Sequence, residues 1–342
     1  MMNLLNNHTI ATNLDQGNGS LSFSLNFSIE SLTRDVYVKP LHSHNDYWRK
    51  HPLFDALSVG AQSIESDIWY FPNNYTVTKT MAETETETET TVKDSFNNQQ
   101  IYVGHNQVFL NSNNTLNNLY LDPLFEFLQS SNPQFKFDDS SIPESPLLEE
   151  HGSKHGVFYN SPESSLYLWF DFKTDANSTY DALKPLIQKF IDREFVAYYD
   201  VDKQQYVPGP LVLTITGNLP QEKVEAESKR YLFLDAPLKV FVNETNEAEL
   251  SKWQELSRVA SGSLADLLGD TYESSTTRNF DLNQKQTLQS IFDKAHKYKL
   301  KTRVWGDITW PNSILNSHLR NYFELGSDFI NVDNLKLASE VL

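Results

Sequence analysis

The chain has 342 residues, of which 39% are hydrophobic and 13% aromatic, and it contains no cysteine. This length is enough for a large buried core, and α/β barrels of this size commonly form a single domain. The lack of cysteine excludes disulfides, thiolate metal ligands and a cysteine nucleophile. The formal net charge of −17 argues against a nucleic-acid partner, because phosphate backbones are bound by clustered Lys and Arg side chains.

An anionic substrate would be repelled by this charge unless something local offset it, and a bound divalent cation is the simplest candidate. The sequence has no run near the roughly 18 consecutive apolar residues that cross a bilayer, so we expect no transmembrane segment. Residues 1–20 lack the basic and apolar regions of a secretory signal. The sequence therefore indicates no particular compartment.

Residues 1–34 are polar and show no sustained hydrophobic period, which predicts an N-terminal extension. From Val36 onward, short apolar runs alternate with segments of helical spacing. The predicted strands are 36–41, 62–71, 165–173, 210–217, 230–237, 301–308 and 328–334. The predicted helices are 52–60, 121–130, 179–193, 246–258, 283–299 and 311–326. Such alternation is typical of a parallel α/β fold, and we predict one domain over residues 35–342.

Two parallel architectures compete, a doubly wound sheet and a closed barrel. No glycine-rich phosphate loop follows the first strand, and polar clusters follow several different strands. That distribution favours a barrel, whose site is assembled from many strand ends. Closure into eight strands does not follow from the spacing, because a strand between residues 255 and 270 is weakly marked.

Two stretches have the composition of insertions. Residues 79–100 form an acidic, alternating, low-complexity run, which predicts a disordered loop without a function of its own. Residues 131–164 are also rich in loop-forming residues.

The clearest chemical signal is the pair Glu65 and Asp67, one residue apart in an apolar strand. Alternate side chains of a strand share a face, so the two carboxylates point the same way. Carboxylates placed together in an apolar setting favour a hard, oxygen-seeking cation such as Mg²⁺ or Ca²⁺. A structural pairing with Lys or Arg is the alternative explanation.

Other strand ends carry similar chemistry. The first predicted strand runs into His42 and His44, a later extended segment ends at His105, and Asp171 and Lys173 share one face of a third strand. Each feature alone is unremarkable, since a single histidine after a strand is usually structural. Together they give the layout of polar strand ends that a barrel active site requires.

These motifs resemble a known superfamily. The order His44-Asn45, Glu65-x-Asp67, Gly104-His105 and Asp171-x-Lys173 is similar to that of the phosphatidylinositol phospholipase C-like phosphodiesterases, which are distorted TIM (β/α)8 barrels. More narrowly, PLHSHNDYWRKHP, QSIESDIW, VGHN, LFLDAPL, RVWGDITWP and NVDNL resemble the fungal family of altered inheritance of mitochondria protein 6. The resemblance extends from about Val36 to Leu342. The His-Arg-Gly opening of glycerophosphodiesterases is missing, which puts glycerophosphodiester specificity in doubt.

The resemblance implies a role for each matching residue. It makes His44 and His105 the catalytic histidines, with Lys173 facing the phosphate of the substrate, and it makes Glu65, Asp67, Asp171 and Asn45 the metal ligands. His42 shares a strand face with His44 and competes with it; we expect it to lie beside the substrate or to position another group.

Five further positions near strand ends each allow more than one role. Trp305 either forms an apolar wall for the substrate or packs in the core, and Asp333 is expected to cap a helix. Asp46, Tyr47 and Arg49 either contact substrate or form an ordinary salt-bridged turn.

The resulting prediction is a metal-dependent phosphoric diester hydrolase with one Mg²⁺ or Ca²⁺ ion. Its substrate would be a phosphodiester, either a lipid head group or a soluble glycerophospho-compound. Two alternatives stay open: a barrel that binds a phospho-ligand or a protein without catalysis, and a zinc amidohydrolase-like barrel built on His42 and His44. The sequence does not predict the oligomeric state.

Overall fold

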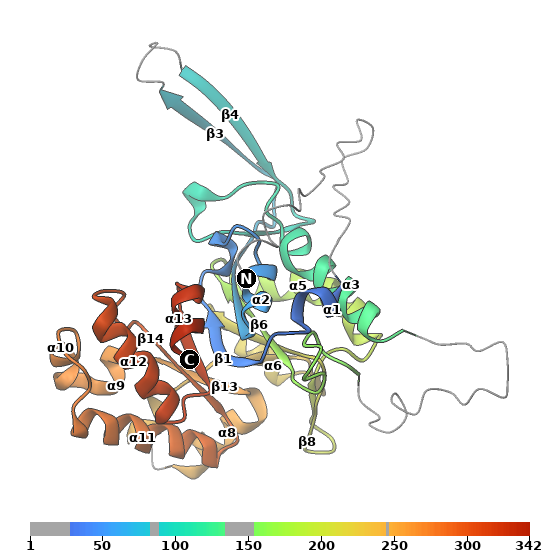
Figure 1. Cartoon of the computed structure of the whole chain (residues 1–342). Helices are drawn as coiled ribbons and strands as arrows, with labels where there is room; N and C mark the ends of the chain where they lie inside the picture. The colour runs from blue at the N-terminus through green and yellow to red at the C-terminus, as the bar shows by residue number, and fades with distance from the viewer. Residues whose placement is uncertain (1–27, 83–88, 134–153, 244–245) are drawn as a thin grey trace.

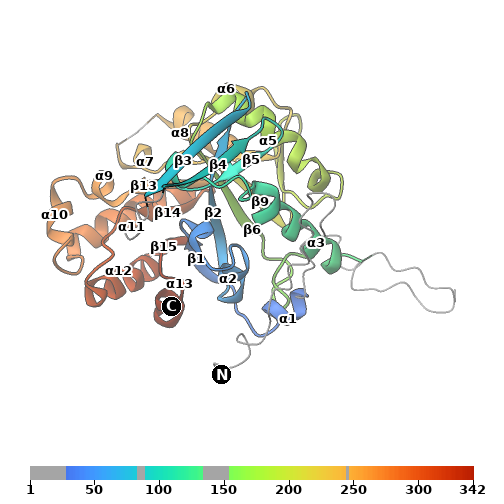
Figure 2. The ribbon, with the colours of Figure 1, turned by 90° about the horizontal axis from the view of Figure 1, so that it is seen from above.

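The computed structural model describes residues 28–82, 89–133, 154–243 and 246–342 (Figure 1). Its centre is a nearly closed barrel of parallel strands surrounded by helices (Figures 1 and 2). The barrel strands are β1 (Lys39–Ser43), β2 (Ala61–Tyr70), β6 (Leu166–Phe172), β9 (Leu211–Gly217), β11 (Leu232–Leu234), β12 (Ala236–Pro237), β13 (Val259–Ser263), β14 (Lys301–Trp305) and β15 (Phe329–Val332). The predicted distorted TIM barrel is confirmed.

The barrel closes through a strand that is broken in the middle. β11 pairs with β9 on one side, whereas β12 pairs with β13 on the other. Only Asp235 separates the two pieces along the chain. Taken together as one strand, they complete an eight-strand circuit in which β15 returns to pair with β1.

The predicted helices are also present, with ends shifted by a few residues. The α-helices are α1 (Ile29–Thr33), α2 (Phe54–Ser58), α3 (Asp122–Ser131), α5 (Ala176–Ile191), α6 (Gln221–Glu225), α7 (Val240–Asn243), α8 (Glu247–Leu256), α9 (Leu264–Leu268), α10 (Tyr272–Ser275), α11 (Leu282–Lys297), α12 (Asn312–Glu324) and α13 (Leu335–Val341). Short turns of 3-10 or π-helix are η1 (Asp46–Trp48), η2 (Gln107–Phe109), η3 (Asn117–Leu121) and η4 (Gly269–Thr271). None of the helices in the described ranges has the length and apolar character needed to cross a membrane.

The remaining strands lie outside the main circuit or pair antiparallel to it. They are β3 (Tyr75–Ala82), β4 (Glu89–Phe96), β5 (Ile101–Val103), β7 (Tyr198–Asp200), β8 (Gln205–Val207) and β10 (Lys229–Arg230). β3 and β4 form an antiparallel ribbon that projects away from the barrel in Figure 1.

Three parts of the chain differ from the sequence-based picture or fall outside it. Where a disordered loop was predicted over 79–100, residues 79–82 and 89–96 belong to the β3–β4 ribbon, residues 97–100 form a turn, and residues 83–88 lie outside the described residues. Most of the loop-rich segment 131–164, namely 134–153, also lies outside them. Within the predicted N-terminal extension, α1 buries Ile29 against the domain.

A layer of mostly large hydrophobic side chains occupies the barrel interior, and the polar side chains of the barrel lie at one end of it. The layer consists of Tyr167, Trp169, Val212, Phe233, Val259, Phe329 and two side chains from outside the barrel strands, Ala197 and Tyr199. Alternation along each strand then places the next inward-facing side chains closer to the carboxyl ends of the strands. These are the polar residues of the candidate site, at the end where barrel enzymes carry their active sites.

Candidate functional site

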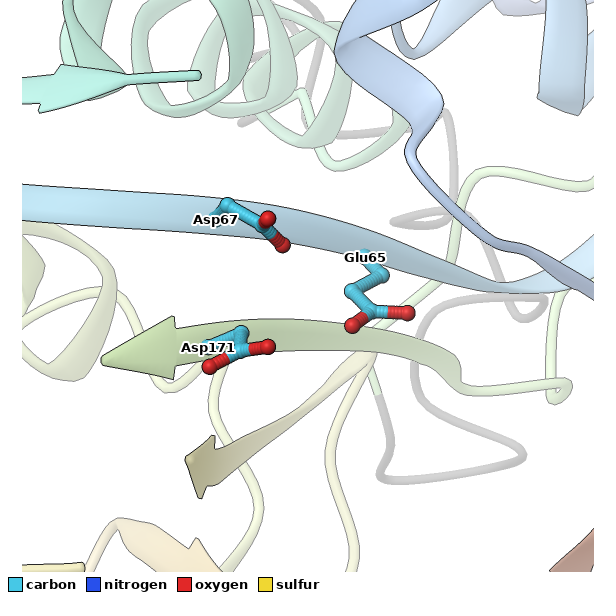
Figure 3. A group of neighbouring side chains, drawn as sticks. All are labelled: Glu65, Asp67 and Asp171. Carbon is cyan, nitrogen blue, oxygen red and sulfur yellow. The ribbon is translucent and has the colours of Figure 1, made fainter. Parts of the chain in front are cut away.

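Three carboxylates from two neighbouring strands converge at the carboxyl end of the barrel. Glu65 and Asp67 lie on β2, and the strand register places Asp67 directly opposite Asp171 of β6. One oxygen from each of the three side chains lies within 4.8 Å of the other two. Figure 3 shows the three carboxylates, those of β2 together with that of the adjacent β6. In the described part of the chain they form a group suited to a metal ion, as the alternation in β2 predicted.

The free atoms of this group suit a hard cation. Oδ1 of Asp67 is buried and has no hydrogen-bond partner among the described residues, while Oδ2 lies 2.8 Å from the Tyr47 hydroxyl. Gly217 makes room for Asp171: its φ is +74°, and a Cβ there would lie 2.1 Å from Oδ1 of Asp171. An all-carboxylate donor set matches Mg²⁺ or Ca²⁺, which the chemistry of the site therefore accommodates.

The carboxyl groups differ in how strongly they resist ionisation. Burial raises the pKa of Asp67 to about 6, and the neighbouring Asp171 charge adds to the rise. Burial also raises the pKa of Asp171, although Lys173 opposes the shift. For Glu65, burial is outweighed by Arg303 and by the hydrogen bond from His42, so its pKa lies well below the usual value. A dication would relieve the cost of ionising the first two groups.

The formal charges of the carboxylate cluster are not balanced by its neighbouring cations. Three carboxylates are opposed by two cations, Lys173 at 2.6 Å from Asp171 and Arg303 at 3.0 Å from Glu65. With neutral histidines the cluster keeps one negative charge, which would repel a phosphodiester monoanion. A dication changes the total to one positive charge, and the phosphodiester then brings it to zero.

His42 is part of the support for Glu65. Its side chain is fully buried in β1, with Nδ1 at 2.7 Å from the Ser63 hydroxyl and Nε2 at 2.8 Å from Glu65. Both ring nitrogens are therefore taken by the protein. These contacts fit the positioning role and leave no nitrogen for direct contact with a substrate or for zinc, so the amidohydrolase-like alternative finds no support here.

His44 lies at the mouth of the barrel, just beyond the end of β1. Asn45 follows it with φ 48° in the left-handed region, which asparagine tolerates better than most residues. Nδ1 of His44 lies 2.7 Å from Asp333, and this contact leaves Nε2 for chemistry. The helix-cap prediction for Asp333 is wrong: the cap of α13 is Asn334, whose side chain accepts from Leu337 N–H.

His105 reaches the same cluster from a different strand. β5 pairs antiparallel with β2, and Gly104 N–H donates to the Asp67 carbonyl, so the next residue emerges beside that carboxylate. Nδ1 of His105 lies 3.4 Å from Oδ2 of Asp67 and 3.3 Å from the Tyr47 hydroxyl. Its side chain is 47% exposed, which leaves it accessible to a substrate.

Tyr47 and Asn45 connect the two histidines. The Tyr47 hydroxyl lies 2.6 Å from Oδ1 of Asn45 and 2.8 Å from Asp67, and Nδ2 of Asn45 lies 3.2 Å from Nδ1 of His44. The Asn45 oxygen, predicted as a metal ligand, thus already has a protein partner. The contacts run from His44 through Asn45 and Tyr47 to Asp67 and His105, so both histidines border one site.

Of the other predicted residues, some lie at the site and others form a turn that supports it. Lys173 bridges Asp67 at 3.1 Å and Asp171 at 2.6 Å, and Trp305 is 45% exposed at the end of β14. Asp46 is fully buried and accepts from the Ser43 hydroxyl and Leu53 N–H. Its contacts are those of a structural turn, which Arg49 completes.

Two residues of the barrel interior were missed by sequence reasoning. Arg303, only 4% exposed, donates to Glu65 and to Asn331 and lies 5.0 Å from the Trp169 ring. Asp235 interrupts the fifth strand and accepts from the Thr216 hydroxyl at 3.0 Å, and burial raises its pKa to about 7. Arg303 lies in β14 and Asp235 between β11 and β12, and nothing in the sequence identified their partners.

The buried His42 should make stability depend on pH. Burial, helped by the Arg303 charge, lowers its pKa from 6.5 to about 3. As the pH falls, His42 of the unfolded chain takes up a proton before His42 of the folded chain does. The contribution of the neutral, buried His42 to stability is therefore complete above about pH 6.5 and is lost at lower pH.

As the pH is lowered from 7 to 5, we expect the free energy of unfolding to decrease more steeply in the native chain than in His42→Gln. The difference in slope should approach about 1.4 kcal/mol per pH unit. Urea unfolding at several pH values in that window measures it. Parallel pH profiles for the two proteins would contradict the assignment.

Comparisons with known proteins agree with this geometry. The family model for an AIM6-like phosphodiesterase domain matches residues 30–96 and 88–235. Altered inheritance of mitochondria protein 6 from Saccharomyces cerevisiae strain RM11-1a is 34% identical over 333 residues, covering 92% of this chain and 74% of that protein. The protein of the same name from Eremothecium gossypii is 33% identical, covering 92% and 72%. The Kluyveromyces lactis protein is 31% identical, covering 90% and 73%. The barrel, its carboxylate cluster and these relatives together show that the chain belongs to the altered inheritance of mitochondria protein 6 family.

Proposed function

We propose that this chain is a metal-dependent phosphodiesterase in which Glu65, Asp67 and Asp171 hold one Mg²⁺ or Ca²⁺ ion. The observation that supports this most is the convergence of three carboxylates with two histidines that border the same cluster. Its substrate is a phosphodiester, from a lipid head group or a soluble glycerophospho-compound. When bound, the ion supplies positive charge that offsets the charge developing on the phosphate oxygens.

The histidines move the protons of the reaction. One takes a proton from the attacking oxygen while the other donates a proton to the oxygen that leaves phosphorus. Asp333 holds His44 through Nδ1 and so directs Nε2 to the reaction. Lys173, already between two carboxylates, is placed to attract the phosphate. Trp305 supplies an apolar wall for the substrate. Asn45 contacts both His44 and Tyr47 and so helps to hold these two side chains in place beside the carboxylate cluster.

Hydrolysis of bis(4-nitrophenyl) phosphate in the presence of Mg²⁺ or Ca²⁺ tests the proposal. We expect turnover that stops with a chelator, returns with the metal and is lost in Asp171→Asn. Asp181→Asn is the matched control, because Asp181 is an exposed carboxylate on α5 that pairs with Lys223. Turnover that survives both the chelator and Asp171→Asn would remove the metal from the mechanism.

The pairing of Asp333 with His44 gives a separate expectation. Asp333→Asn should lower kcat by roughly 10- to 100-fold, because the imidazole loses the acceptor that sets its tautomer. Asp333→Glu, which keeps the carboxylate, should recover part of the activity, and KM should change less than kcat in both variants. Steady-state kinetics measures the effect, and an unchanged kcat in Asp333→Asn would show that the contact has no role in turnover.

A further inference from the structure

A cavity of about 240 Å³ lies beside His44, between β14, β15 and the helices α12 and α13. The aliphatic side chains on its wall are Val304, Ile308, Leu315, Leu319, Val332 and Leu337. Trp305 and His44 also line it. The space therefore opens next to a histidine to which we assign proton transfer, and most of its wall is hydrocarbon.

Two of the polar side chains that line the cavity, Asp307 and Asn331, already have partners within the protein. Asp307 accepts from the Tyr322 hydroxyl at 3.0 Å and from the Ile308 N–H at 2.7 Å, and it lies 3.0 Å from Nδ1 of the buried His318. Oδ1 of Asn331 accepts from Arg303. A polar ligand would have to compete with these bonds, whereas an apolar ligand needs only to cover hydrocarbon.

His44 lines the cavity and also belongs to a series of contacts that leads to the carboxylate cluster. Nδ1 of His44 lies 2.7 Å from Asp333, which also lines the cavity, and 3.2 Å from Nδ2 of Asn45, and Asn45 leads through Tyr47 to Asp67. A molecule with its phosphate at the cluster would thus have one of its two ester arms beside His44, next to the cavity.

We propose that this cavity binds the apolar chain of one of the two alcohols joined by the phosphate, so that the substrate class is an alkyl- or acyl-bearing phosphodiester. The inference rests on the proposed function, because it takes the phosphate to lie at Glu65, Asp67 and Asp171. It goes further by choosing a lipid-type diester over a soluble glycerophospho-compound. The volume, below the 300 to 1,000 Å³ of a typical ligand pocket, suits part of a chain rather than a whole lipid.

Titration calorimetry of the full chain with methyl, butyl and hexyl phosphate, with Mg²⁺ present, tests the inference. Each methylene buried in the cavity should tighten binding about fourfold, so butyl phosphate should bind roughly 60-fold more tightly than methyl phosphate. Leu315→Phe and Ile308→Phe each narrow the cavity and should remove most of this gain. Leu282→Phe is the matched control, since Leu282 is 72% exposed on α11, and it should keep the native chain-length series. Thermal melting of each variant verifies folding.

The outcomes separate this inference from the proposed function. An affinity that stays flat from methyl to hexyl phosphate, in a protein that hydrolyses bis(4-nitrophenyl) phosphate, overturns the cavity assignment and leaves the phosphodiesterase standing. A gain with chain length that persists in both Phe variants also overturns it, because the chain then binds elsewhere. Loss of the gain in those variants alone, with Leu282→Phe unchanged, supports it.

Discussion

Replacing His105 by alanine should lower kcat for phosphodiester hydrolysis by on the order of 10²- to 10⁴-fold, the usual contribution of one general acid or base. The physical reason is that its ring is accessible and lies beside Asp67 and the Tyr47 hydroxyl, where an attacking or leaving oxygen would exchange a proton. The folded state should hardly change, because an exposed side chain outside the core contributes little to stability. Steady-state kinetics and thermal melting of the same preparation measure both effects.

His296→Ala is the matched control for this variant. His296 is 38% exposed and lies 2.7 Å from Asp328, so it too is an accessible histidine beside a carboxylate. Asp328 precedes β15, however, which puts this pair at the amino end of the barrel. We expect its kcat to equal that of the native chain. Equal activities for the native chain and His105→Ala would refute the assignment of His105.

Replacing Arg303 by methionine should destabilise the protein by about 3–5 kcal/mol, because it removes one partner from a buried ion pair. Its guanidinium donates to Glu65 at 3.0 Å and to Asn331 at 2.8 Å. Without it, His42 is the one close partner that Glu65 keeps within the described residues, and the buried carboxylate must either remain poorly compensated or take up a proton. Urea unfolding at pH 7 measures the loss.

Arg278→Met provides the comparison, since Arg278 is 61% exposed and pairs with Asp281 on the surface. Its effect should stay within about 0.5 kcal/mol. A loss below about 1 kcal/mol in Arg303→Met would mean that the pair is well solvated and does not hold Glu65 in place.

Much of the site was predictable because it depends on strand geometry. The alternation of side chains brings Glu65 and Asp67 to one face of β2 from sequence alone. Parallel strands align their carboxyl ends, so Asp171 and Lys173 at the end of another strand belonged to the same edge of the barrel. In such a fold, polar residues at successive strand ends are close in space although they are far apart in the chain.

Residues that act through distant partners could not be predicted in this way. Asp333 stands just before a helix, where a carboxylate commonly caps, and only the pairing of β15 with β1 brings it to His44. Arg303 shares its strand face with Lys301 and Trp305, and the pattern does not reveal that its partner is Glu65. Long-range contacts of this kind depend on barrel closure.

Individual elements of the fold were missed where local composition was misleading. β13 consists of Val, Ala, Ser, Gly and Ser, small residues that lack the β-branched and aromatic signal of a strand but suit a crowded barrel. The alternating Thr and charged residues around position 80 were interpreted as a disordered run, yet such alternation is also compatible with the antiparallel pairing of β3 and β4. The break at Asp235 leaves no mark in the sequence.

Metal binding by the full chain tests the central claim most directly. Titration calorimetry with Mg²⁺ and with Ca²⁺ should show one site per chain for at least one of the two ions. Binding should disappear in the triple variant Glu65→Gln, Asp67→Asn and Asp171→Asn, and it should persist in Asp181→Asn. Failure of both ions to bind the native chain, or equal binding by the triple variant, would contradict the account.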